Sequence, residues 1–408
     1  MRILFANKFW FCSGGVERVM FDEIAWLEAA GHETAHFATA SVRNAYSPWA
    51  RYFPPLEDLA NPTDRPLVEQ MRTAVRLVRN RRAAELFGQL VNDFRPDVVH
   101  AHAIHRQLSP SVLLVAAAAG IPVVETVHDH HHTCPGDLLL RGDGEVCAPQ
   151  LCRPGWYLPA ITHRCMKSQT AVSAVAAFEV YAQSVTHAYE RSVSAYVCPS
   201  RFMLDRVQSQ GWRAPCVHIP NAVKPDVPGD VREDYVVFVG RLSREKGVEL
   251  LLRAAKQAAI RLVIVGDGPL KDRVQATPGV EWHGWLPEEE MRSYVRRARV
   301  AVLPSLCFEN APLAVLEAMS MGVPVIASDI GGVGEIISHM ETGMLVQPGD
   351  EAQLAQALRQ AIDAPDLMLS MGERAREETS RRFSPSQHVT QLERLYERVR
   401  DQASAGSK

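Results

Sequence analysis

The sequence predicts an α/β protein built from two doubly wound parallel sheets. Three observations support this class. The chain has 408 residues, more than one hydrophobic core usually serves. Short runs rich in Ile, Val and aromatic residues alternate with segments of helical periodicity along its length. A proline-rich stretch, VHIPNAVKPDVPGD, separates the two halves of this pattern.

The first half contains five segments that we expect to form strands. They are apolar almost throughout, as strands are when helices cover both faces of a parallel sheet. These segments are 2–6, 33–38, 97–101, 122–127 and 195–199. The predicted first domain covers residues 1–215.

The second half repeats the pattern, and the proline-rich stretch at 215–230 is the expected hinge. Its predicted strands are 235–240, 261–266, 280–284, 299–304 and 323–328. We expect a second domain over 216–380 and a final helical segment over 381–408 that crosses back to the first domain. Open parallel sheets bind ligands beyond the carboxyl ends of their strands. Two such domains facing a central cleft would place the chemistry in that cleft.

The composition excludes some classes of function. Hydrophobic residues make up 47% and charged residues 22%, which is typical of globular domains. A net charge of −3 provides no general basic surface, so we expect no nucleic acid partner. The start, MRILFA, lacks the pattern of a secretory signal, which favours a cytoplasmic protein.

Two cations follow the first strand of the second half. Arg241 comes directly after YVVFVG, and Lys246 precedes Gly247 at an expected helix entrance. A helix N-terminus with fixed cations suits a diphosphate, because both stabilise negative charge. The alternative is a solvated loop with two surface charges.

Two glutamates, Glu309 and Glu317, follow the strand RVAVLP with seven residues between them. We expect Glu309 in a loop and Glu317 on the following helix. One carboxylate could then accept hydrogen bonds from sugar hydroxyls and the other from a ribose, with helix amides between them. The alternative is an amphipathic helix with a surface glutamate. Gly266, in VIVGDGP, is either part of this site or a tight strand-to-helix turn.

Taken together, VFVGRLSREKG, VGDGP, ENAPLAVLEAM and GVPVIASDIGG resemble family 4 of the retaining nucleotide-sugar glycosyltransferases. SGGVER, TVHD and IPNAV extend the resemblance over the first half. It implies the GT-B fold, with two Rossmann-like domains.

The resemblance also implies roles for individual residues. Arg241 and Lys246 would bind the donor diphosphate, Glu309 would contact the donor sugar, and Glu317 would hold the ribose. Gly266 and the run Asn310, Ala311, Pro312 and Leu313 complete the predicted donor site. Gly14 and Gly15 match a Gly-Gly turn, His128 matches a sugar-binding histidine, and Asn221 matches a cleft asparagine. Asn310, Ala311 and Pro312 replace a commoner Gly-Phe-Gly, which leaves sugar selection open.

The expected reaction is transfer of a sugar, from UDP by preference, to a glycan or lipid-linked acceptor in bacterial cell-surface polysaccharide or glycolipid synthesis. No Asp-x-Asp pair occurs in the sequence, so the cations would replace a divalent ion and no catalytic cofactor is expected. The family's retaining transfer is discussed as front-face attack, in which the protein supplies positioning and charge stabilisation. His128 would contact the sugar and Asp129 would orient the acceptor, unless they cap the loop. The alternatives are an epimerase or hydrolase of nucleotide sugars and a non-catalytic nucleotide-sugar sensor.

An insertion over 130–168 is too long for an ordinary turn between strand and helix. Its cysteines, Cys134, Cys147, Cys152 and Cys165, predict a structural zinc site, since zinc can fold a loop without a core. Disulfides and independent buried thiols are the alternatives.

A basic segment over 67–94 carries arginines at helical spacing, namely Arg72, Arg76, Arg79, Arg81 and Arg82. It is interpreted either as a peripheral contact with the inner membrane surface or as a solvated helix packed on the sheet. The second interpretation is favoured.

Overall fold

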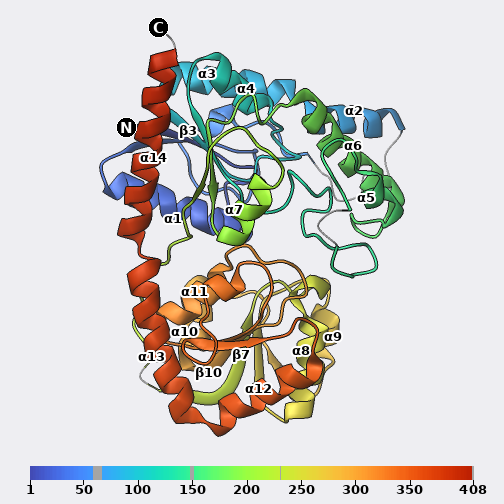
Figure 1. The fold of residues 1–408 in the computed structure, drawn as a ribbon, viewed down its shortest axis with the longest axis vertical. Helices are drawn as coiled ribbons and strands as arrows, with labels where there is room; N and C mark the ends of the chain where they lie inside the picture. The colour runs from blue at the N-terminus through green and yellow to red at the C-terminus, as the bar shows by residue number, and fades with distance from the viewer. Residues whose placement is uncertain (58–66, 148–150, 230, 407–408) are drawn as a thin grey trace. The chain divides into compact units, whose positions relative to one another are not determined.

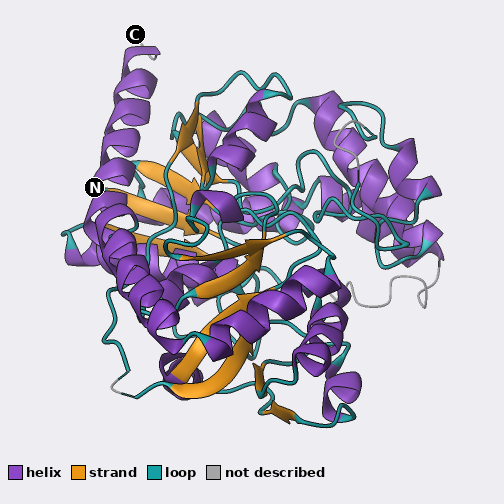
Figure 2. Ribbon diagram, turned by 60° about the horizontal axis from the view of Figure 1, so that its bottom comes forward, coloured by secondary structure: helices purple, strands orange, loops and turns teal. Residues whose placement is uncertain are grey.

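The computed structural model describes residues 1–57, 67–147, 151–229 and 231–406. The chain forms two compact units, Met1–Ile219 with Val389–Lys408, and Pro220–His388. Each unit contains a six-stranded parallel sheet with helices on its faces (Figures 1 and 2). This arrangement confirms the predicted fold class.

The first sheet has the strand order β2-β1-β3-β4-β5-β6, and every neighbouring pair is parallel. Its strands are β1 (Arg2–Ala6), β2 (Glu33–Phe37), β3 (Val98–Ala101), β4 (Val123–Thr126), β5 (Ala195–Cys198) and β6 (Cys216–His218). The edge strand β6 lies inside the stretch predicted as hinge. Its three half-buried residues are too few for a clear pattern.

Helices cover both faces of this sheet because its strand residues alternate in direction. Ile3 and Phe5 pack with α1 and the last helix, while Leu4 and Ala6 pack toward α3 and α4. The helices are α1 (Gly15–Ala29), α2 (Leu67–Val78), α3 (Arg81–Phe94), α4 (Ser111–Ala118), α5 (Leu158–Thr162), α6 (Thr170–Thr186), α7 (Arg201–Gln208) and α14 (Pro385–Gly406). A short 3₁₀ turn, η1, covers Ala50–Tyr52.

The second sheet has the order β12-β11-β10-β7-β8-β9, again all parallel. Its strands are β7 (Glu233–Val239), β8 (Leu262–Val265), β9 (Val280–Trp282), β10 (Ala298–Leu303), β11 (Val325–Ser328) and β12 (Gly343–Val346). The sequence did not predict β12, a four-residue strand at the sheet edge.

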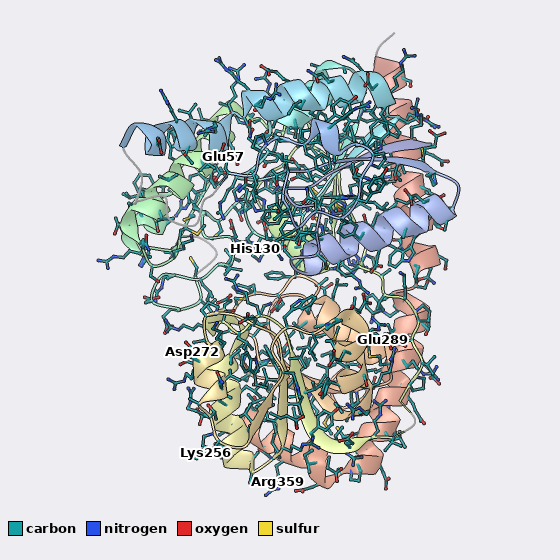
Figure 3. The ribbon with its side chains drawn as sticks, turned by 180° about the vertical axis from the view of Figure 1, so that it is seen from behind. Glu57, His130, Lys256, Asp272, Glu289 and Arg359 are labelled. Carbon is teal, nitrogen blue, oxygen red and sulfur yellow. The ribbon has the colours of Figure 1, made fainter. Side chains whose placement is uncertain are left out.

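The described residues of the second unit form six α-helices and two 3₁₀ turns before α14. They are η3 (Arg244–Lys246), α8 (Val248–Ala258), α9 (Lys271–Gln275), α10 (Glu288–Arg297), α11 (Leu313–Ser320), η4 (Val333–Glu335), α12 (Glu351–Asp363) and α13 (Pro365–Arg382). Lys256, Asp272 and Arg359 mark α8, α9 and α12 in Figure 3. Because α13 extends to Arg382, the predicted final segment at 381 begins inside it. None of the described helices has the length and apolarity needed to span a bilayer.

Candidate functional site

The loop between β10 and α11 holds Glu309 in a fixed position. Its backbone pairs with Gly331, and the amide of Gly332 donates to Glu309 O at 2.8 Å. Oε1 of the side chain accepts from Lys246 Nζ at 2.6 Å and from Ser305 Oγ at 2.5 Å. Only 9% of the residue is exposed. Glu309 is therefore anchored through its main chain and through one carboxylate oxygen.

A close backbone contact brings Lys246 to this loop. Gly247 has a φ of +69°, and a Cβ there would lie 1.9 Å from Pro304 O. Only glycine permits this approach. The amide of Leu306 also donates to Glu245 O at 2.8 Å, which joins the same two loops.

The Lys246–Glu309 pair is charged. Burial alone would lower the pKa of Lys246, but the Glu309 carboxylate outweighs it and the pKa is raised. Burial, with Glu309 nearby, raises the pKa of the Cys307 thiol to about 12, so this thiol is neutral. Among the described residues, Glu309 Oε2 has no hydrogen-bond partner.

Arg241 and Gly266 lie at the carboxyl ends of β7 and β8. The Arg241 side chain is exposed and makes no ion pair within the described parts of the chain. Gly266 has a φ of +142°, and a Cβ there would lie 1.9 Å from Gly240 O. Position 266 requires glycine because the loops after β7 and β8 pack closely there. This close packing supports the interpretation of Gly266 as part of a tight turn.

The rest of the predicted donor site forms the start of α11. Asn310 and Ala311 precede the helix, Pro312 is its N-cap residue, and Leu313 is its first residue. Asn221 Nδ2 donates a hydrogen bond to Ala311 O at 3.0 Å, and this bond helps to hold the loop in place. Glu317 lies one turn into the helix, and its Oε1 is 3.9 Å from Arg292 Nη1.

In the first unit, Gly14 and Gly15 form the start of α1. Gly14 has an extended φ of −178°, which any residue can adopt. A Cβ there would meet only Glu17 Oε2, at 3.9 Å. A side chain at Gly14 would therefore have room, but the atom nearest to it belongs to the acidic Glu17 of the first turn of α1.

His128 ends a chain of buried polar groups behind β4. Its Nε2 lies 2.8 Å from His102 Nδ1, and His102 Nε2 lies 3.4 Å from the buried carboxylate of Glu23. Burial and the neighbouring His102 hold the pKa of His128 well below its usual value. His128 is therefore neutral near pH 7. His102 and Glu23 were not singled out in the sequence, because β3 and α1 place them there only in three dimensions.

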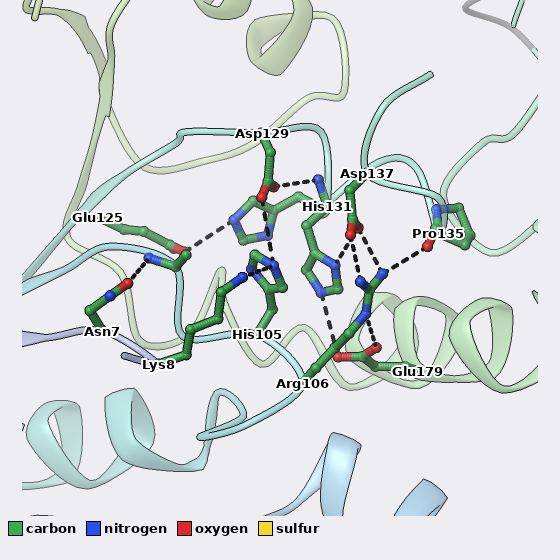
Figure 4. A network of polar contacts seen from close by, with 12 residues as sticks. Asn7, Lys8, His105, Arg106, Glu125, Asp129, His131, Pro135, Asp137 and Glu179 are labelled. Carbon is green, nitrogen blue, oxygen red and sulfur yellow. Dashed lines mark hydrogen bonds and ion pairs between the residues drawn. The ribbon is translucent and has the colours of Figure 1, made fainter. Parts of the chain in front are cut away.

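Asp129 stabilises its own loop. Its Oδ1 accepts from the His131 amide at 2.9 Å, as in the loop-capping alternative. Its Oδ2 lies 3.6 Å from His105 Nε2, which in turn lies 3.2 Å from Lys8 Nζ (Figure 4).

Arg106 forms the centre of a second buried network, which the sequence did not reveal. Its guanidinium donates to both oxygens of Asp137, at 2.5 and 2.8 Å, and lies 3.5 Å from Glu179. His131 contacts the same two carboxylates, at 3.1 and 3.5 Å (Figure 4). Burial alone would lower the pKa of His131, but Glu179 and then Asp137 raise it to about 9. A positively charged His131 thus holds the insertion to α6.

The four cysteines of the insertion lie near one another, and none of them forms a disulfide in the described structure. Burial, with the Asp137 carboxylate nearby, raises the pKa of Cys134 to about 12. Burial, with another of these thiols nearby, raises the pKa values of Cys152 and Cys165 to about 11. Among the described residues, some groups of three His, Cys, Asp or Glu side chains have potential metal-ligand atoms within 4.8 Å of one another. None of these groups contains a cysteine. A tetrahedral zinc site needs sulfurs roughly 3.8 Å apart. The structural zinc site stays a prediction.

The basic segment forms two helices, because Asn80 starts α3 by accepting from the Ala83 amide at 3.0 Å. The arginines Arg72, Arg76, Arg79, Arg81 and Arg82 are all exposed. On the opposite face of α2, Thr73 and Leu77 are buried, and α2 packs beside α6. An exposed face that carries arginines and a packed opposite face are what we expect of a solvated helix, the interpretation favoured from the sequence.

Two family models together match most of the chain. Residues 13–227 match the model described as Glycosyltransferase Family 4. Residues 233–364 match the model described as Glycosyl transferases group 1.

Individual proteins are similar over long stretches. The sulfoquinovosyl transferase of Arabidopsis thaliana is 29% identical over 306 residues, which are 71% of this chain and 54% of the plant protein. The chain thus spans about half of that relative's length. Sucrose-phosphate synthase from Thermosynechococcus elongatus superposes with a TM-score of 0.69 at 19% identity, covering 98% of this chain and 99% of its own. Anabaena HepE in complex with UDP-glucose superposes with a TM-score of 0.63 at 18% identity, covering 97% and 99%.

Proposed function

This chain belongs to glycosyltransferase family 4, and from that premise we propose that it transfers a sugar from a nucleotide diphosphate to an acceptor, with retention at the anomeric carbon. The observation that carries the proposal is the Lys246–Glu309–Ser305 cluster in front of α11. The family match was expected from the sequence and is confirmed.

The donor diphosphate binds at the cationic side of this cluster. The Lys246 ammonium donates one hydrogen bond to Glu309, and its two other N–H groups donate to phosphate oxygens. Arg241 is exposed at the neighbouring strand end, and the first amides of α11 add the positive end of a helix dipole. These groups stabilise the charge that develops on the departing nucleotide, a role that a divalent ion has in other transferases.

The donor sugar and ribose bind to the two glutamates. Glu309 Oε1 is held by Lys246 and Ser305, so Oε2 accepts from sugar hydroxyls in a fixed geometry. Glu317, one turn into α11, accepts from the ribose hydroxyls. UDP is the proposed nucleotide, since a protein of the same fold, Anabaena HepE, is known in complex with UDP-glucose.

His128 contacts the donor sugar as a neutral group with a defined tautomer. A proton on His102 Nε2 faces the Glu23 carboxylate, so His102 Nδ1 accepts from His128 Nε2. Glu23 and His102 are positioning residues in this proposal.

Retention follows from front-face attack, in which a departing phosphate oxygen takes the proton of the acceptor hydroxyl. The protein then contributes orientation and charge stabilisation in place of a strong base. Asp129 is not proposed as a strong base, because one of its oxygens already accepts a hydrogen bond from the His131 amide. It orients the acceptor through the other. The acceptor is a glycan or a lipid-linked glycan of the cell surface, reached from the cytoplasm.

A donor panel tests the proposal. Purified protein in EDTA is titrated with UDP-, GDP-, ADP- and dTDP-sugars, and binding is measured by calorimetry. We expect one nucleotide class, UDP, to bind without a divalent ion, and product analysis with an acceptor to give an α-configured glycoside from an α-configured donor. Binding that requires a divalent ion, or release of free sugar alone with every acceptor tried, would contradict the proposal.

A further inference from the structure

A buried arginine of the second unit, Arg292, lies close to Glu317, the residue that we assign to the donor ribose. Only 8% of Arg292 is exposed. It belongs to α10, the helix that Glu289 marks in Figure 3. A charge that is removed from water costs free energy unless carboxylates compensate it. The partners of Arg292 therefore indicate what its charge does.

Asp226, in the segment before β7, fixes the guanidinium of Arg292. Its Oδ2 accepts hydrogen bonds from Arg292 Nη2 at 2.7 Å and from Nε at 3.2 Å. Burial alone would raise the pKa of Asp226, but hydrogen bonds from Arg292 and from the Val227 amide lower it, so Asp226 is a carboxylate near pH 7. Because the guanidinium is planar, two bonds to one carboxylate define its orientation.

The third nitrogen of the guanidinium, Nη1, faces two further carboxylates. It lies 3.4 Å from Glu288 Oε1, one turn earlier on α10, and 3.9 Å from Glu317 Oε1 on α11. The Glu288 side chain is half exposed, so water screens its attraction, whereas the Glu317 side chain is only 18% exposed. A separation of 3.9 Å is longer than a hydrogen bond. Arg292 therefore acts on Glu317 through its charge.

Apolar packing sets the distance between α10 and α11. Met291 and Val295 of α10 pack in one core with Leu316 and Met319 of α11 (Figure 1). Arg292 directly follows Met291 and lies about one helical turn before Val295. This core therefore holds the backbone of Arg292 at a fixed distance from the helix that carries the glutamate.

We propose that Arg292 positions Glu317 for the donor ribose. Asp226 fixes the guanidinium, and the guanidinium holds the Glu317 carboxylate in the rotamer that accepts hydrogen bonds from the ribose hydroxyls. A carboxylate that is already held loses less conformational entropy when the ribose binds. The inference rests on the proposed function and narrows its substrate class to ribonucleotides, because a site built to bond a hydroxyl rejects the analogue that lacks it. Arg292 contacts no substrate atom in this proposal and is a positioning residue.

A comparison of two nucleotides tests this role. UDP and 2′-deoxy-UDP share the base and the diphosphate and differ in one ribose hydroxyl, so a general loss of structure weakens both alike. Calorimetry on the full chain should show UDP binding about tenfold more tightly to the wild-type protein, because the deoxy compound lacks a hydrogen bond to a charged group. Arg292→Met removes the charge and should reduce this preference to about twofold or less.

Arg296→Met is the matched control. Arg296, one turn further along α10, also donates to Asp226, at 3.0 and 3.2 Å, but its Nη1 contacts Glu289 instead of Glu317. This variant should keep the preference for UDP although it loses a bond to the same carboxylate. Asp226→Asn removes the charge that orients Arg292 and should also reduce the preference. It provides the test if Arg292→Met does not fold, which thermal unfolding would show.

Glu317→Gln separates this inference from the proposed function. If this variant keeps the preference for UDP, or if the wild-type protein has none, the ribose assignment in the proposed function fails and the inference fails with it. If Glu317→Gln loses the preference while Arg292→Met and Asp226→Asn keep it, the ribose assignment stands and the positioning role is refuted. An equal loss in Arg296→Met also refutes that role, because the cluster then only supports the fold. Loss in the other three variants with retention in Arg296→Met supports the inference.

Discussion

At the scale of single residues, one oxygen of the Glu309 carboxylate contacts protein groups, and we propose that the other contacts the donor sugar. Oε1 is occupied by Lys246 and Ser305, while Oε2 has no hydrogen-bond partner among the described residues. A carboxylate held in this way loses little entropy when a sugar binds, because its rotamer is already fixed. The sequence pointed to Glu309 and Lys246, but their direct contact depends on the loop crossing at Gly247.

Removing each partner of this pair should give different kinetic effects. In Lys246→Ala, the Kd for UDP should rise about tenfold to a hundredfold, because a charge-assisted hydrogen bond contributes roughly 1.5–3 kcal/mol. In Glu309→Ala, kcat should fall more than UDP affinity, because the lost contact is to the sugar. Calorimetry with UDP and initial rates with the full donor distinguish the two. Arg244→Ala, an exposed cation in the same turn, is the control, and an equal loss there would contradict the assignment.

Glu23→Gln tests the positioning of His128. An amide no longer favours a proton on His102 Nε2, so the tautomer of His128 is no longer fixed. We expect kcat for transfer to fall about tenfold, with UDP binding and thermal stability nearly unchanged. Glu33→Gln, an exposed carboxylate, should have no effect. A fall in UDP affinity of the same size as the fall in kcat would refute the positioning role.

At the scale of elements, the insertion is held to the first unit by charge as much as by apolar packing. Arg106, which follows β3, and His131 both contact Asp137 of the insertion and Glu179 of α6. Glu179 is fully buried, so its negative charge needs these partners. The network connects the loop after β3, the insertion and α6.

This network predicts a pH dependence of stability. The pKa of His131 is raised to about 9 in the folded protein, so its contribution is fully present below its unfolded value near 6.5 and is lost as pH rises through 9. The loss should amount to roughly 3 kcal/mol at most. Urea unfolding of the first unit at pH 6 and at pH 10 should show this decline. His131→Asn should flatten it, and an equally steep decline in the variant would contradict the prediction.

The cysteines of the insertion give a separate test. If zinc completes this element, elemental analysis of protein purified without added metal should find about one zinc ion per chain. Cys134→Ser and Cys165→Ser should each remove it, whereas Cys12→Ser, at an exposed site outside the insertion, should not. Zinc-free protein whose insertion resists proteolysis would show that buried thiols suffice.

At the scale of the whole molecule, the two ends of the chain fold together. Residues from Val389 onward belong to the unit that begins at Met1. Leu392, Leu395 and Tyr396 of α14 pack in the same core as Ile3 and Phe5 of β1, and Tyr396 Oη lies 2.7 Å from His100 Nδ1. The first unit is therefore incomplete until the last helix has been made.

Leu392→Ala should consequently destabilise the first unit although it lies near the end of the chain. The residue is fully buried, and removing a buried leucine side chain costs roughly 2–5 kcal/mol. Urea unfolding followed by hydrogen exchange should show the loss in β1 and α1, with little change in the sheet of the second unit. Arg398→Ala, exposed on the same helix, should change stability by less than about 0.5 kcal/mol. Equal effects of the two substitutions would argue against this packing.

The sequence by itself determined the fold class, ten of the twelve strands and the family, because apolar strands and glycine-bearing loops depend on local patterns. It missed the edge strands β6 and β12, although it predicted β2 and β9 at the opposite edges. β6 has only three residues and lies in the proline-rich stretch, and pairing with a neighbour can outweigh local composition in an edge strand. Only the tertiary structure decided that Lys246 meets Glu309, that Glu23 and His102 lie next to His128, and that Arg106 meets Asp137. Those contacts join residues that are far apart in the sequence, and a local pattern holds no information about which buried charges will meet.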